Sequence, residues 1–260
     1  MSPPLEVGVA AVALWNPSPA ARPQPSILPP NERRRAPDSV AIALQVAHAA
    51  CLQAGRDPAR LPMVFASTYG DLAITDYMCS TLASAPTTLS PTRFHNSVHN
   101  AAAGYWTIAT GCREPYCALG AGVYSFAAGL LAAAVQVCAD QTDVLLVAYD
   151  TEVRGAPQSE LAESHGMLGI ALLLSTSPRA GEAGLQLAVA PRAETDTATA
   201  IGAASTNAMA AGLPLVAALR GGAVEMLPLP LGPDSTLQVR IQRGGEKISL
   251  SSLPEAASRR

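Results

Sequence analysis

Charged residues are scarce in this sequence of 260 amino acids. They make up 14% of the chain against 49% hydrophobic residues, and the formal net charge is −3. This composition excludes a disordered chain and supplies enough apolar material for a large buried core. The 17 basic residues form no stripe apart from Arg33, Arg34 and Arg35, so a surface that follows a nucleic-acid backbone is not indicated. We expect that short run to lie in a solvated loop.

The cysteines lack the spacing that metal sites and disulfide frameworks use. Their number is odd, and none forms a CxxC pair or stands with histidines at ligand spacing. We therefore expect no metal, no cofactor, and reduced cysteines in the core of a cytoplasmic protein. The five residues are Cys51, Cys79, Cys112, Cys117 and Cys138.

The sequence also has no run of about 18 uninterrupted apolar residues, so we predict no membrane-spanning helix. The apolar stretch near the start, VGVAAVAL, lacks the basic flank of a secretion signal, carries Glu6 and is followed by a proline-rich segment. A first buried strand over residues 5–15 is the better interpretation.

Strand-like and helix-like segments alternate along the chain. Prolines in residues 16–37 predict a loop, because proline fixes φ and lacks a donor. Apolar residues at helical spacing before Gly55 predict a helix over 38–55. Further helices are expected over 71–85, 97–110, 121–139 and 198–211, and strands over 61–68, 114–119, 142–150, 167–175, 184–190, 222–229 and 235–242.

This order of elements predicts an α/β fold in α-β-α layers with a mostly parallel, five-stranded sheet. Weaker signals near the end predict a short C-terminal αβ extension. The chain accordingly divides into a first domain over 1–177, a reduced second half or cap over 178–243, and a flexible tail over 244–260.

Chemistry in an open α/β sheet is expected where strands end and helices begin. In PYCALGAGVYSFAAGLLAA, residues 115–133, a short strand enters a Gly-Ala-Gly turn and then a helix. This is the shape of a nucleophile elbow, which exposes a serine or cysteine at a strained turn. No such residue stands in the turn: Cys117 lies earlier, in the strand, and Ser125 lies about one turn into the helix.

A second unusual stretch is FHNSVHNAAAGYWTI, residues 94–108, which gathers His95, Asn96, His99 and Asn100. His95 and His99 are four residues apart and would share one helical face. That spacing suits a metal ion, but no third ligand is identifiable. A hydrogen-bonded polar network is the favoured interpretation.

Residues 5–177 resemble the N-terminal half of the β-ketoacyl synthases of the thiolase superfamily. FHNSVHNAAAGYWTIATGCREPYCALGAG is similar to their interface helix, a turn and the strand that enters the catalytic cysteine. DVLLVAYDTEV and ESHGMLGIALLLS are similar to the next two strands. The run SPTRFHNSVHNAAAG, residues 90–104, resembles the motif SPTxFHxSVHNAxAG of chain-length-factor subunits from aryl polyene pigment clusters.

Two departures from a working ketosynthase stand out. Counting from Pro115 puts the family's catalytic cysteine at about Gly122 or Val123, where no nucleophile stands. The two histidines that a ketosynthase takes from its second half are missing as well, because no histidine follows residue 178. The resemblance therefore implies a non-catalytic subunit. Such a subunit pairs with a catalytic ketosynthase, meets the acyl carrier protein through it, and shapes the tunnel for the growing polyene, polyketide or fatty-acid-like chain.

The resemblance also implies that residues 94–108 and the strand at 114–119 lie at a subunit two-fold axis. Polar groups buried there must be hydrogen-bonded, and such networks set partner choice. The short strand would leave an uncovered sheet edge, so the chain is not expected to be a stable monomer, and a homodimer is one form open to it when it is alone. The expected interface residues are His95, Asn96, His99, Asn100, Tyr105, Trp106, Tyr116 and Cys117.

Two alternatives stay open. A small α/β hydrolase or acyltransferase would use Ser125 or Cys117 as its nucleophile. Asp150 would be its acid and His165 its base, in the chain order of that fold, although the GxSxG motif is absent. A homodimeric binding protein would instead hold an acyl chain or a small aromatic molecule. The residues that could line its tunnel, if they are not ordinary core, are Met63, Met78, Phe126 and Met167.

Overall fold

The computed structural model describes residues 3–16, 22–152, 166–192, 207–221 and 224–243. Its helices and strands follow the predicted order closely, with short additional helices between them. In chain order they are β1 (Leu5–Trp15), α1 (Pro30–Arg35), α2 (Asp38–Ala54), η1 (Pro58–Arg60), β2 (Met63–Ala66), α3 (Leu72–Ser84), η2 (Pro86–Thr88), α4 (Pro91–His95), α5 (Ala101–Thr110), β3 (Tyr116–Leu119), α6 (Ser125–Asp140), β4 (Val144–Asp150), β5 (Leu168–Ser175), β6 (Ala183–Pro191), η5 (Ala208–Gly212), α7 (Leu213–Leu219), β7 (Met226–Pro230) and β8 (Ser235–Arg243).

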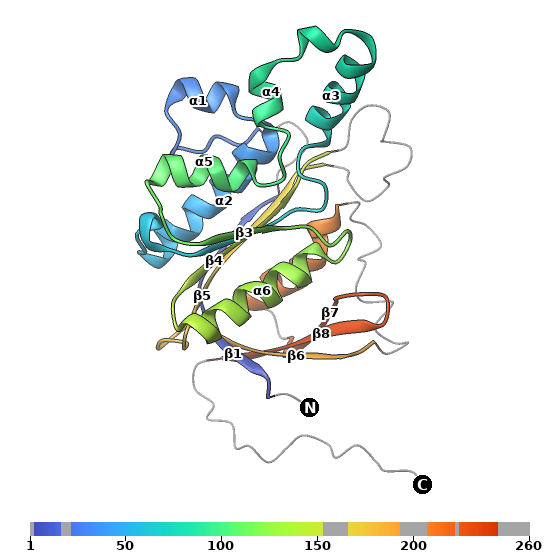
Figure 1. The fold of residues 1–260 in the computed structure, drawn as a ribbon. Coiled ribbons are helices and arrows are strands. Elements are labelled where there is room, and N and C mark those ends of the chain that lie inside the picture. The colour runs from blue at the N-terminus through green and yellow to red at the C-terminus, as the bar shows by residue number, and fades with distance from the viewer. Residues whose placement is uncertain (1–2, 17–21, 153–165, 193–206, 222–223, 244–260) are drawn as a thin grey trace.

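The strands form one eight-stranded sheet in the order β3-β2-β4-β5-β1-β6-β8-β7. Helices α2 and α5 cover one face of this sheet, and α6 and α7 lie on the other, which gives three layers (Figure 1). The predicted layered α/β class is therefore confirmed.

The sheet differs from the predicted one in its number of strands and in their directions. Among the described strands two of the seven pairings are parallel, those of β2 with β3 and with β4, and the other five are antiparallel. A fully apolar strand has the same hydrophobic pattern in either direction, so the sequence of β5 did not reveal that it runs against both β4 and β1.

Helix α6 is the central helix of the larger core cluster. It packs against β1, β2, β4 and η5, and most of its residues are alanine, leucine, valine or glycine. Gly129 lets it approach the sheet, since a Cβ there would lie 2.8 Å from the Cβ of Ala66. The segment Gly122–Asp140 is long and apolar enough to cross a membrane by length and composition alone, but in this fold it is a core helix.

The opposite face of the sheet is covered by α2 and α5, whose buried side chains form the second core cluster. Met63 belongs to this cluster, whereas Phe126 belongs to the cluster around α6. The sheet thus separates two of the residues that the binding-protein hypothesis placed in one tunnel. Both are fully buried core residues.

Strand β1 lies between β5 and β6, and the loop that joins those two strands crosses over it. Gly8 permits the crossing, because a Cβ there would lie 2.7 Å from the backbone nitrogen of Pro178. Beyond the crossing, β6, β8 and β7 continue the same sheet. The predicted division at residue 178 stays a prediction, and the predicted tail over 244–260 lies outside the described residues.

Three predicted elements need correction. The Arg33–Arg35 run lies in the short helix α1, which begins with a proline at its first position, and not in a loop. The helix predicted over 97–110 begins only at Ala101, because α4 ends at His95 and a turn separates the two. The helix predicted over 198–211 falls partly outside the described residues, and the helical residues that follow are η5 and α7.

Candidate functional site

The parallel strands β3, β2 and β4 end at one edge of the sheet, where polar side chains gather. Asp150, the last residue of β4, is buried there beside Ser67 and Thr68, which follow β2. The Ser67 hydroxyl donates to Asp150 Oδ1 at 2.7 Å. The Thr68 N–H donates to both carboxylate oxygens, at 3.0 and 3.2 Å. Asp150 thereby fixes the path of the chain as it leaves the neighbouring strand.

Burial and hydrogen bonding act in opposite directions on Asp150. Loss of solvent raises the pKa of its carboxyl group, and the hydrogen bonds from Thr68, Ser67 and the Tyr69 backbone lower it by a smaller amount. The net shift is upward. The fold therefore holds a carboxyl group with weakened acidity directly beneath the turn that follows β3.

That turn has the geometry of an elbow. Gly122 has φ +56° in the left-handed region, where glycine is favoured, and α6 begins three residues later. The Thr68 hydroxyl donates to the Gly122 carbonyl at 3.3 Å, which ties the turn to the end of β2. The predicted strand–turn–helix shape is confirmed, and the residues at its apex, Gly122 and Val123, carry no nucleophilic side chain.

Ser125 has a structural role at this turn. Its hydroxyl donates to the Gly122 carbonyl at 2.7 Å and accepts from the Ala121 N–H at 2.9 Å, and the residue is fully buried. Asp150 is bonded to Ser67 and Thr68 instead of to an imidazole. His165 lies outside the described residues. The described geometry therefore gives no support to a serine hydrolase, whose nucleophile must donate to a base.

His99 joins the polar edge from the turn before α5. Its Nε2 lies 3.0 Å from the Ser67 carbonyl oxygen, and because a carbonyl only accepts, Nε2 is the nitrogen that carries the proton. Gly120 leaves room for the ring, since a Cβ there would lie 3.3 Å from Nε2. His99 thus links the end of β2 to the turn after β3 and acts as a positioning group.

The other polar residues of the 94–100 stretch make separate contacts within the chain, and the network predicted for them at a subunit interface stays a prediction. Asn100 donates to the Tyr116 hydroxyl at 3.0 Å, and the His95 ring lies 6.4 Å from that of Tyr105. No hydrogen bond joins the histidines and asparagines of the stretch to one another in the described part of the chain. His95 ends α4 while His99 lies in a turn, so the two do not share a helical face.

Two buried polar atoms in this region have no hydrogen-bond partner among the described residues. They are Oδ1 of Asn96 and the indole Nε1 of Trp106. Trp106 was predicted to lie at a subunit interface, but its side chain is fully buried in the core beneath α5. It cannot contact a partner, and that part of the interface prediction is wrong.

The strand β3 is the end strand of the sheet, and helices do not cover both of its faces within one chain. Cys117 is consequently exposed, as is Cys79 on α3, so the expectation that all cysteines are buried is wrong for these two. Cys138 is half-buried. Cys51 and Cys112 are buried as expected, and burial, with smaller effects of Asp57 and Cys112, raises the pKa of Cys51 to about 12.

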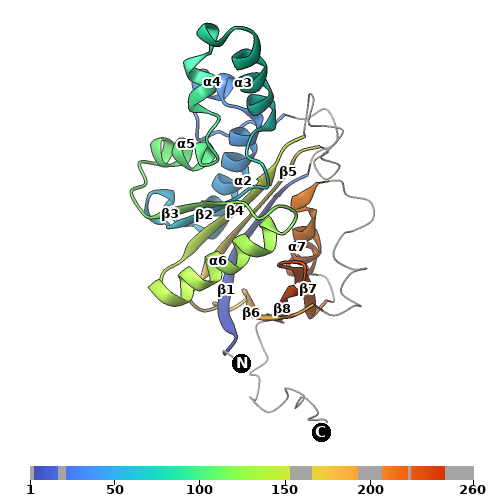
Figure 2. The same ribbon diagram turned by 45° about the vertical axis from the view of Figure 1, so that its right-hand side comes forward.

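Large apolar side chains are exposed around β3. Figure 1 and Figure 2 both show α5 alongside β3 at the end of the sheet, with α4 beyond it. Ile108 on α5 is 81% exposed, and Phe94, Val98 and Tyr116 are each more than two-fifths exposed. We call these four residues the α5–β3 surface. An apolar surface next to an unpaired strand is typical of a protein–protein interface.

A pocket of about 480 Å³ opens between the starts of α2 and α3 and the helix α4. Its apolar lining includes Ala73, Ile74 and Met167, and the buried Asn96 contributes to its wall. Of the four residues proposed for a tunnel, only Met167 lines this pocket, and Met78 is half-buried elsewhere on α3. Four arginines lie around it: Arg22, Arg34, Arg35 and Arg93.

Sequence reasoning found the elbow, Asp150 and His99 but missed Ser67 and Thr68. Their position directly after a fully buried strand, which pairs with β4, is the feature that could have pointed to them, because ligands of α/β sheets bind at strand ends. No group of three or more histidine, cysteine, aspartate or glutamate residues that could hold a metal ion occurs in the described ranges.

The comparisons with known proteins identify a family and a fold. The model of the β-ketoacyl synthase N-terminal domain matches residues 10–227. No curated protein matches the chain. Among solved structures, a ketosynthase in complex with its chain length factor from Xenorhabdus doucetiae is 20% identical with a TM-score of 0.69, and the match covers 91% of this chain and 99% of that one.

Two further solved structures are similar. The ishigamide ketosynthase/chain length factor is 15% identical, with a TM-score of 0.60 and coverage of 94% and 100%. A type II polyketide ketosynthase in complex with its acyl-carrier protein is 9% identical, with a TM-score of 0.62 and the same coverage. These identities are low, so the likenesses establish the thiolase-like fold. With the family model matching most of its length, the chain belongs to the β-ketoacyl synthase family, through that family's N-terminal domain.

Proposed function

We propose that this chain is a non-catalytic, ketosynthase-like subunit, a chain-length factor. In this proposal it pairs with a catalytic β-ketoacyl synthase and forms part of the wall of the acyl tunnel. It would thereby limit the length of a polyene, polyketide or fatty-acid-like chain carried on an acyl carrier protein.

The observation that carries the proposal is the elbow without a nucleophile. The turn after β3 keeps the geometry of a nucleophile elbow, with Gly122 in the left-handed region and α6 directly behind it. Gly122 and Val123 offer no atom that could take an acyl group. The nearby Ser125 hydroxyl is bonded within the turn.

The α5–β3 surface supports the proposed pairing. Its exposed apolar side chains flank an end strand, and another subunit that added a strand there would cover both. The similar solved structures include ketosynthases in complex with chain length factors. A heterodimer through this surface is therefore the arrangement we propose, with a homodimer as the form of the isolated chain.

The pocket beside α4 supports a role in shaping a tunnel. Ile74 and Met167 contribute apolar surface to a lining that is otherwise mostly polar or charged, and Thr151 and Glu152, which follow Asp150, line it as well. A growing acyl chain that enters from the partner would meet these residues. Larger side chains there would shorten the product.

The proposal is tested by co-expression with a full-length ketosynthase, followed by incubation with acyl and malonyl carrier proteins and intact-protein mass spectrometry. We expect the two chains to co-purify and the acyl adduct to form on the ketosynthase alone. An acyl adduct on this chain would make it an enzyme. The binding-protein alternative would be supported if the chain bound none of the ketosynthases tested and instead bound a fatty acid as a homodimer.

A further inference from the structure

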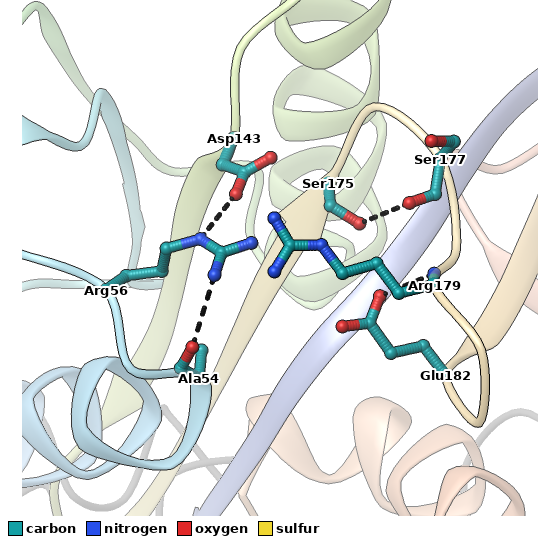
Figure 3. A network of polar contacts seen from close by, with 7 residues as sticks. All are labelled: Ala54, Arg56, Asp143, Ser175, Ser177, Arg179 and Glu182. Atoms are coloured by element: carbon teal, nitrogen blue, oxygen red, sulfur yellow. Dashed lines mark hydrogen bonds and ion pairs between the residues drawn. The ribbon is translucent and has the colours of Figure 1, made fainter.

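Two arginine side chains point toward one another near the start of β4, at the end of that strand opposite Asp150 (Figure 3). Arg56 follows α2, and Arg179 lies in the loop between β5 and β6, so residues more than a hundred positions apart come together. Figure 3 shows their guanidinium groups pointing toward one another, with Asp143 and Glu182 on either side. Neither arginine belongs to the elbow or to the α5–β3 surface.

Arg56 is held firmly from three directions. Gly55 ends α2 in the left-handed conformation, and the Arg56 N–H donates to the Cys51 carbonyl at 3.0 Å. Its Nε donates to Asp143 Oδ2 at 2.8 Å, and its Nη1 donates to the Ala54 carbonyl at 3.3 Å. The side chain is 19% exposed. Its position is therefore fixed by the fold and not by a ligand.

The remaining guanidinium nitrogen of Arg56, Nη2, makes no hydrogen bond within the described chain. Nη2 is buried and has no hydrogen-bond partner there. A buried donor left without a partner is destabilising, so proteins rarely keep one without a water or a ligand. This donor faces the guanidinium group of Arg179 (Figure 3).

Arg179 is placed by its own backbone. Its N–H donates to Glu182 Oε2 at 2.9 Å, and the Glu182 N–H donates to the Arg179 carbonyl at 2.9 Å, which closes a tight turn. The Arg179 guanidinium group has no hydrogen bond or ion pair to any described residue. The turn thus presents a cation with all of its donors free.

Two guanidinium groups that point at one another repel unless something negative lies between them. The two neighbouring carboxylates are already bonded elsewhere, Asp143 to Nε of Arg56 and Glu182 to a backbone N–H. We propose that this pair is a binding site for a tetrahedral oxyanion, phosphate or sulfate, free or as the terminal group of a small molecule. The proposal does not rest on the proposed function.

The chemistry of arginine favours that class of ligand. The planar guanidinium group matches the oxygens of phosphate through two parallel hydrogen bonds, and a tetrahedral anion has enough oxygens for both groups at once. The carboxylates of Asp143 and Glu182 balance the charges of the two arginines, so the long-range attraction of an anion to this site is weak. We therefore expect modest affinity, with geometry and not net charge selecting the anion.

The test uses the full chain in a buffer free of phosphate and sulfate. Inorganic phosphate is titrated by calorimetry, with sodium chloride at equal ionic strength as the reference and phenyl phosphate as a second ligand. We expect saturable phosphate binding in the millimolar range. Tighter binding of phenyl phosphate than of phosphate would identify a ligand-borne group, and equal binding would identify the free anion.

Two variants and a control make the test specific. Arg179→Gln should weaken phosphate binding at least about tenfold, and Arg56→Lys, which keeps the charge but loses the planar fork, should weaken it as well. Arg60→Gln removes an exposed arginine from η1 with the same change in charge and should bind like wild type. Equal phosphate affinity in Arg179→Gln and Arg60→Gln, or no saturable binding to wild type, would overturn the proposal.

Discussion

At the scale of single residues, Asp150 is the only charged residue buried within the described part of the chain. It joins the ends of two neighbouring strands, close to a turn whose residues Gly122 and Val123 carry no nucleophilic side chain. A carboxylate in this place holds the two strand ends together and so supports the elbow. Its charge then affects stability in a way that depends on pH.

The pKa of Asp150 is raised in the folded chain, so the folded state keeps its proton at pH values where the unfolded state has lost it. The stabilisation is complete below the unfolded pKa and is lost as the pH rises through the folded pKa. Urea denaturation measures the free energy of unfolding of wild type and of Asp150→Asn. The difference, wild type minus variant, should fall as the pH rises from the unfolded pKa of Asp150 to its folded pKa. The fall should be about 1.4 kcal/mol for each unit between the two pKa values. A difference that grew with pH would mean that the hydrogen bonds outweigh burial.

Cys117 offers a direct measure of the proposed interface. It is exposed in the single chain, as is Cys79 on α3, so N-ethylmaleimide should label both when the free chain is diluted far enough to dissociate any homodimer. When a ketosynthase is bound, labelling of Cys117 should slow at least about tenfold while Cys79, the internal control, keeps its rate. Peptide mass spectrometry reads both sites. Unchanged labelling of Cys117 in a purified complex would place the partner elsewhere.

At the scale of elements, the approach of α6 to the sheet depends on a single missing side chain. A methyl group at Gly129 would lie 2.8 Å from the Cβ of Ala66 and 3.1 Å from Cδ1 of Leu146. Gly129→Ala should therefore reduce the free energy of unfolding by roughly 1 to 3 kcal/mol, the usual cost of overpacking, despite the higher helix propensity of alanine. Chemical denaturation measures this loss.

Gly104 on α5 is the matched control for Gly129. It is also a helical glycine, but a Cβ there would meet no atom within 4 Å. Gly104→Ala should stabilise the chain by roughly 0.5 to 1 kcal/mol, because only the propensity term changes. Equal effects of the two substitutions would show that α6 can move away from the sheet at no cost.

The elements also show what the sequence could and could not predict. The bounds of β1, α2, β4 and β5 were predicted within two residues, since long apolar runs and helical spacing mark them clearly. The direction of β5 was not predictable, because its partners are set by tertiary packing. At the site, the glycines between strand and helix predicted the elbow. The role of Ser67 and Thr68 could not be predicted, because it depends on the pairing of β2 with β4. Exposure of Cys117 depended on β3 being the end strand.

At the scale of the whole molecule, the end strand β3 and the apolar side chains around it predict that the chain does not remain a monomer. Ile108→Glu should raise the dissociation constant of the homodimer or of the ketosynthase complex at least about tenfold, because a charge would replace an 81% exposed isoleucine within the contact. Leu52→Glu, which charges an exposed apolar residue on α2, should have little effect. Analytical ultracentrifugation and co-purification read the outcome, and equal behaviour of the two variants would exclude the α5–β3 surface as the interface.

The crossing of the β5–β6 loop over Gly8 has a consequence for how the chain is made. β1 leaves the ribosome first, yet both strands that pair with it come from residues 168–187. β1 therefore stays unpaired and strongly apolar until residues 168–175, which form β5, have been synthesised. Long-range strand pairing of this kind makes folding slow and exposes the nascent chain to aggregation. A fragment that stops before β5 has no native partner for its first strand, so a chain cut before residue 168 cannot build the sheet around β1.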